Sequence, residues 1–147
     1  MRRVIYLICF LVLACSKDKD EEPVLSCTIN SSVLSGSTSQ VVDAGSPITN
    51  IIYQLNSSNC AGSFTSINAS GLPPGISASL DSNNDRITLS GTPSSQTSGT
   101  YNYSVSFENS NNGSAVSSSV SGTITVNPVC TVSGSITSGN ADQTITE

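Results

Sequence analysis

Residues 99–108 alternate polar and apolar side chains at every second position, and the apolar ones are Tyr101, Tyr103, Val105 and Phe107. Because successive side chains of a β-strand point to opposite faces, this pattern predicts a strand with one face in a core and the other in water. A second alternation follows the polar segment Asn109–Gly113, with apolar residues at Val116, Val120, Ile124 and Val126. The two alternating segments flank an Asn-Asn-Gly sequence, so we predict that they form an antiparallel hairpin with its turn at Asn109–Gly113.

The same two-residue period recurs earlier in the chain. Ile87 and Leu89 share one face of a predicted strand, and the polar run 82–85 before it predicts a turn. That strand lies around residues 86–90, and residues 77–80 are predicted to be its hairpin partner. Further strands are predicted around residues 51–55 and 64–67. No segment after residue 15 has helical spacing over two turns. Short strands separated by turns predict an all-β sandwich.

Several motifs occur in a fixed order between residues 48 and 127. They are Gly71-Leu72-Pro73-Pro74-Gly75-Ile76, Leu80-Asp81, Ile87-Thr88-Leu89-Ser90-Gly91-Thr92-Pro93, Gly99-Thr100-Tyr101-Asn102-Tyr103-Ser104-Val105 and Gly122-Thr123-Ile124-Thr125-Val126. In this order they resemble the Ig-like domain of bacterial surface proteins. The resemblance implies an Ig-like β-sandwich in which glycine and proline turn the corners between strands. It also implies that a strand ends near Pro93, which has no N–H to donate to a sheet.

An uncharged apolar run, residues 4–14, follows Arg2 and Arg3 at the N-terminus. A basic start and a short apolar run indicate a secretory signal, and a spanning helix would need roughly twenty residues. The run ends in Val12-Leu13-Ala14-Cys15, which resembles the lipobox of bacterial lipoproteins. The resemblance implies a signal peptide over residues 1–14 and a lipid on Cys15 that anchors the protein in the membrane. An ordinary signal peptide with an incidental Cys15 is the alternative.

Six of the seven residues from Ser16 to Glu22 are charged. Such a segment cannot bury itself, so residues 15–23 are predicted to form a disordered acidic tether. The charged residues Lys17, Asp18, Asp20, Glu21 and Glu22 resemble the export signal of surface-exposed Bacteroidetes lipoproteins. The resemblance implies a lipid-anchored outer-membrane protein exposed at the cell surface. A protein that faces the periplasm is the alternative.

Residues 27–44 align without gaps to residues 130–147, and Cys27 and Cys130 open the two copies. This repeat predicts one Ig-like domain over residues 24–127 and the first strands of a second, truncated repeat over residues 128–147. The chain is then a fragment of a longer array. A genuine C-terminus with a frayed tail is the alternative.

Five cysteines are present, of which Cys9 would leave with the signal peptide and Cys15 would carry lipid. Disulfides form in exported proteins. Because Cys130 is the repeat equivalent of Cys27, its partner would lie beyond residue 147. The repeat therefore predicts a disulfide between Cys27 and Cys60, with free thiols as the alternative.

The chain contains no histidine, and only three basic residues remain after the predicted cleavage, against ten acidic ones. Without a basic patch, nucleic-acid binding is excluded. Without histidine, a Ser-His-Asp triad, a Cys-His pair and a His-based zinc site cannot be assembled. We therefore expect no catalytic residues, no metal site and no cofactor.

Two weaker possibilities concern the few acidic and aromatic residues of the domain. Related cadherin-like domains bind calcium through acidic loops, and the acids available here are Asp43, Asp81, Asp85 and Glu108. Asp81 and Asp85 also suit a turn, because Asx side chains stabilise turns. Tryptophan is absent, so a stacking platform for a glycan would have to use Tyr53, Tyr101 and Tyr103.

These observations favour a lipid-anchored cell-surface Ig-like module that acts in adhesion, in display or as a structural stalk. Its only expected partners are the membrane, through Cys15, and an unknown protein or glycan ligand. One alternative is a non-catalytic spacer of a larger anchored enzyme or glycan-binding protein. Another is calcium-dependent, cadherin-like adhesion.

Overall fold

The computed structural model describes residues 25–130. Within this range the chain forms eight strands and no helix, so no helix here is long and apolar enough to cross a membrane. The strands are β1 (Thr28–Ser35), β2 (Ser39–Asp43), β3 (Ile51–Ser58), β4 (Phe64–Ser70), β5 (Ile76–Asp81), β6 (Arg86–Gly91), β7 (Gly99–Asn111) and β8 (Ser114–Asn127).

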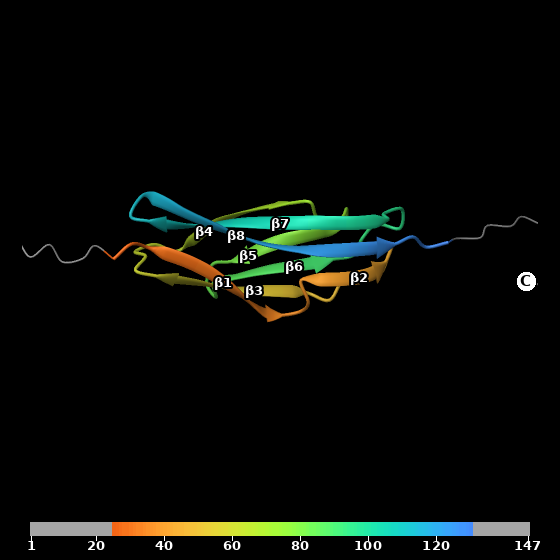
Figure 1. Ribbon diagram of the computed structural model, residues 1–147, viewed down its shortest axis with the longest axis horizontal. Coiled ribbons are helices and arrows are strands. Elements are labelled where there is room, and N and C mark those ends of the chain that lie inside the picture. Colours follow the sequence, from red (N-terminus) through yellow and green to blue (C-terminus); the bar gives the residue numbers. More distant parts are fainter. Residues whose placement is uncertain (1–24, 131–147) are drawn as a thin grey trace, which may run out of the picture.

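The strands form two four-stranded sheets that face each other (Figure 1). The first sheet has the order β1-β3-β6-β5, and the second has the order β2-β8-β7-β4. All neighbours are antiparallel except β2 and β8, which are parallel. The chain therefore passes from the first sheet to the second between β1 and β2. This arrangement confirms the predicted all-β, Ig-like sandwich.

Both predicted hairpins are present, because β5 pairs with β6 and β7 pairs with β8. The predicted turn Asn109–Gly113 was too wide, since β7 continues to Asn111 and only Asn112 and Gly113 connect the strands. Both connecting residues have positive φ, 46° and 82°, as tight hairpin turns require. Asn109 was misassigned because it is polar. It lies fully buried in β7, where its side-chain Nδ2 donates to the Gly62 carbonyl.

The core lies between the sheets and is built from the alternating apolar residues of both inner faces. Ile87, Leu89, Val105 and Phe107 are fully buried, which confirms the inward faces predicted for β6 and β7. Phe64 from β4 packs edge-to-face on Phe107, with ring centroids 5.9 Å apart. Such aromatic pairs stabilise the fold beyond the area that they bury.

A pair of tyrosines links the two sheets in the middle of this core. The hydroxyl groups of Tyr53 in β3 and Tyr103 in β7 are 2.8 Å apart and hydrogen-bonded, and both side chains are buried. The Tyr103 hydroxyl lies against Gly122 of β8, where a Cβ atom would come within 2.3 Å of it. The absence of a side chain at Gly122 therefore makes room for the tyrosine pair.

Candidate functional site

A disulfide joins Cys27 and Cys60 at one end of the sandwich, as the repeat predicted. Cys27 directly precedes β1 and Cys60 follows β3, and the first paired residues of these strands are Thr28 and Ser58. The disulfide thus extends the β1–β3 ladder by a covalent link. Within residues 25–130, β1 is an edge strand that pairs with β3 alone, and the disulfide fastens it there.

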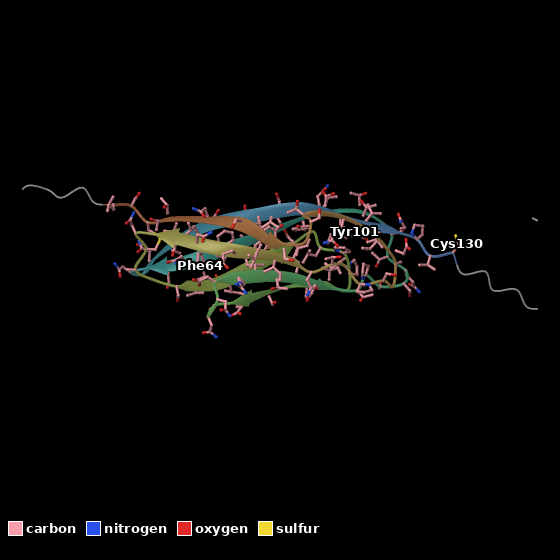
Figure 2. All side chains as sticks on the ribbon, turned by 90° about the horizontal axis from the view of Figure 1, so that it is seen from below. Phe64, Tyr101 and Cys130 are labelled. Atoms are coloured by element: carbon pink, nitrogen blue, oxygen red, sulfur yellow. A yellow bond between two sulfur atoms is a disulfide. The ribbon has the colours of Figure 1, made fainter. Side chains whose placement is uncertain are left out.

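The predicted lipid anchor, export signal and second repeat lie wholly or mostly outside residues 25–130. Cys15 and the proposed export signal precede residue 25, and the second repeat, 128–147, lies beyond residue 130 except for its first three residues, so all three stay predictions. Cys130 itself is exposed and forms no disulfide within residues 25–130. Figure 2 places Cys130 beyond the end of the sandwich and Phe64 toward the opposite end.

The acidic turn between β5 and β6 is held by Asp81. Its carboxylate accepts hydrogen bonds from the backbone N–H groups of Asn83 and Asn84 and from the Asn84 side chain at 2.8 Å. The Asn84 side-chain bond is the main cause that lowers the pKa of Asp81, because it stabilises the charged form. Asp85 adopts a positive φ of 51° in the same turn. These contacts agree with the interpretation of this segment as a turn.

The acids considered for calcium binding do not gather in residues 25–130. No group of three or more His, Cys, Asp or Glu side chains in this range lies close enough to hold a metal ion. Asp43 instead accepts a hydrogen bond from Asn127, and Glu108 accepts one from Ser66. Each of these carboxylates is thus used in a contact between neighbouring strands.

The tyrosines considered as a glycan-stacking platform are not available for that role. Tyr53 and Tyr103 are in the core, where their hydroxyls bond to each other. Burial, which disfavours the phenolate, raises the pKa of both hydroxyls. Tyr101 is half-buried, and its hydroxyl donates to the Ser98 carbonyl. The three tyrosines were candidates for glycan stacking because they are aromatic. Their positions along the strands direct them toward the core instead.

The outer faces of β7 and β8 carry short, mostly uncharged polar side chains. Those on the outer face of β7 are Thr100, Asn102, Ser104, Ser106, Glu108 and Ser110, and those on β8 include Ser117, Ser119, Ser121, Thr123 and Thr125. Thr100 and Thr123 form cross-strand hydrogen bonds with Thr125 and Asn102. Such a surface suits recognition by backbone edges and small hydroxyl groups more than by charged or aromatic contacts.

The chain enters the domain at one end of the sandwich and leaves it at the other (Figure 1). β1 begins at one end of the sandwich, beside the β7–β8 turn, and β8 finishes at the other (Figure 1). Any chain before residue 25 and any chain after residue 130 therefore attach at opposite ends. Two features of the domain therefore bear on its function, the polar outer faces of β7 and β8 and the path of the chain through the sandwich.

Residues 30–127 match the family described as Putative Ig domain. The chain belongs to this family. Among curated proteins, none matches it. The Ig domain is also similar to the solved structure of AggA, the major subunit of aggregative adherence fimbriae type I from Escherichia coli. The two are 16% identical over 70% of this chain and 97% of AggA, with a TM-score of 0.39. Nothing about function follows from a likeness at this level.

Proposed function

We propose that this chain is a lipid-anchored surface module whose Ig domain acts as a stalk or adhesive display unit. The observation that carries the proposal is the path of the chain through the domain. Because the chain enters and leaves at opposite ends, a domain anchored at its N-terminal end holds whatever follows away from the membrane (Figure 1). In this proposal, the lipobox ending at Cys15 supplies the anchor, and the charged tether before residue 24 separates the domain from the membrane.

The composition of the domain supports display more than chemistry. The outward side chains of β7 and β8 are short, polar and, except for Glu108, uncharged. The acids Asp81 and Glu108 serve a turn and a cross-strand contact. The chain has no histidine to act as a general base. Loops at the ends of a sandwich and exposed strand edges are the parts of such a domain that commonly bind partners.

The anchor is tested by growing cells that express the chain with radiolabelled palmitate. We expect label in the wild type and none in a Cys15→Ala variant, and a Cys130→Ala variant serves as the matched control that keeps its label. Label that persists in the Cys15→Ala variant would show that the anchor is wrongly assigned.

Surface display is tested with an epitope tag placed after Glu147. On intact cells, we expect antibody and protease to reach this tag. Replacing Lys17, Asp18, Asp20, Glu21 and Glu22 with serine should abolish access and leave lipidation unchanged. A tag reached only after the outer membrane is opened would favour the periplasmic alternative.

The stalk role is tested separately, by removing residues 25–127 from the tagged chain. A stalk predicts that antibody access falls when the domain is removed, although the anchor and the tether remain. Equal access with and without the domain would contradict the stalk and leave adhesion by the domain itself as the function to test.

A further inference from the structure

The first half of β8 has a strand neighbour on one side only. β8 pairs with β7 along its whole length, from Ser114 to Val126, whereas β2 pairs with β8 only from Thr123 to Asn127. Within residues 25–130, no strand pairs with the other side of Ser114–Ser121. The second sheet is therefore left with a step in its edge, next to the short strand β2.

Every second residue along this open edge of β8 directs its backbone N–H and C=O groups away from β7. The Thr123 N–H donates to the Thr38 carbonyl on the β2 side, at 2.8 Å. Polar backbone groups of a strand alternate in direction, and the β7–β8 register has no irregularity. Residues Ala115, Ser117, Ser119 and Ser121 therefore direct their N–H and C=O groups toward the same open side. Unpaired groups in such a row form a template for another strand.

The sequence of this segment does nothing to block such pairing. Natural edge strands are usually protected by lysine, proline or a bulge. Ser114–Gly122 contains no charged residue and no proline, and all its side chains are serine, alanine or valine except for the final glycine. Its residues Ser117, Ser119 and Ser121 are exposed. A second strand could therefore approach closely at low cost.

The segment is also complementary to itself when read in the opposite direction. An antiparallel copy centred on Ser118 places Val116 opposite Val120 and Ser117 opposite Ser119. In this register, Ala115 lies opposite Ser121. The residues that direct their backbone groups outward then face one another, so side-chain matching and backbone hydrogen bonding select the same register. We propose that Ser114–Gly122 pairs antiparallel with the same segment of a second copy of this chain, about a two-fold axis at Ser118.

The neighbouring strand of the first sheet supplies a second reason for a partner at this edge. Val33 of β1 pairs with the inward-facing Tyr53, so it lies on the core side of β1, yet it is 47% exposed. Leu34, next to it at the irregularity in β1, is 52% exposed. β1 lies along the same side of the sandwich as β8 (Figure 1). In the pairing about Ser118, Val116 of the second copy, which is only partly buried in its own domain, would lie opposite Val120 beside this rim of the core.

The pairing is tested by cysteine cross-linking in the full chain carrying Cys130→Ser. Ser118 would face Ser118 of the second copy as a pair without mutual hydrogen bonds, at about 4.5 Å between Cα atoms, which a disulfide can span. The matched control is Ser119→Cys, which would meet its own counterpart only diagonally, at roughly 7–8 Å. We expect mild oxidation to give at least about tenfold more disulfide-linked dimer in Ser118→Cys than in Ser119→Cys. Equal yields, or no dimer from either folded variant at any concentration, would overturn the proposal.

A charge exchange tests the register independently. Combined with Ser118→Cys, the double change Ser117→Lys, Ser119→Lys places lysines opposite lysines, whereas Ser117→Glu, Ser119→Lys places opposite charges together. We expect cross-linking to fall in the first variant and to return in the second. Both positions are exposed, so circular dichroism should show the same fold in each. Cross-linking that ignores the sign of the charge would refute this register. The proposal does not depend on the anchor or on the stalk role.

Discussion

Breaking the disulfide by Cys27→Ser, Cys60→Ser is expected to destabilise the domain substantially. The link closes a loop between residues 33 apart in the sequence and joins the start of β1 to the end of β3, with which β1 pairs. Without it, β1 is held by its ladder to β3 and by partly buried Ile29, while Val33 and Leu34 remain exposed. Fraying should therefore start at the Thr28 end of β1, where the disulfide is lost.

The magnitude follows from the size of the loop. Closing a loop of this length removes chain entropy from the unfolded state worth about 3.7 kcal/mol at 25 °C. For a domain of about 100 residues, a loss of this size lowers Tm by about 15–20 °C. Both cysteines are half-buried, so replacing sulfur with oxygen leaves no large cavity to add to the cost.

The assay is thermal unfolding followed by circular dichroism, with Cys130→Ser as the control for losing an exposed cysteine. Dithiothreitol should lower the Tm of the wild type to that of the double variant and should leave the double variant unchanged. Amide hydrogen exchange should accelerate first along β1. A double variant within about 3 °C of the wild type would refute the reasoning from loop entropy.

Three further predictions concern the tyrosine pair and the glycine beside it. Tyr53→Phe and Tyr103→Phe should each cost about 1–2 kcal/mol in urea unfolding, because the remaining hydroxyl loses its buried partner. The double change should cost less than the sum, and strictly additive losses would contradict the bond between the two hydroxyls. Folding raises both pKa values, so the unfolded chain binds fewer protons above pH 10, and stability should fall as pH rises from 9 to 11. In the variant with both tyrosines changed to phenylalanine, stability should fall much less over this pH range. If its stability falls as steeply as in the wild type, other groups cause the loss. Gly122→Ala should cost about 1–3 kcal/mol, since its Cβ would meet the Thr38 carbonyl oxygen at 2.2 Å. The exposed control Ser121→Ala should cost almost nothing.

Much of the fold could be predicted because the alternation that marks a β-strand is a pattern of residues close together in the sequence. The two-residue alternation of β6 and β7 identified which side chains are buried, and the Asn-Gly pair at 112–113 marked the hairpin. The repeat alone identified Cys60 as the partner of Cys27, and the structure has this disulfide. Asn109 was misread as part of a turn because its polarity is a local signal, whereas its bond to Gly62 joins segments 47 residues apart.

The sequence alone determined an Ig-like arrangement of strands, a candidate anchor at Cys15 and the disulfide, because each depends on periodicity, motif order or repeat spacing. Only the tertiary structure decided that Tyr53 and Tyr103 meet in the core, and that β2 stops short of the first half of β8. Both facts depend on how the two sheets are laid against each other. That packing is set by contacts between residues far apart in the chain, which no local pattern specifies.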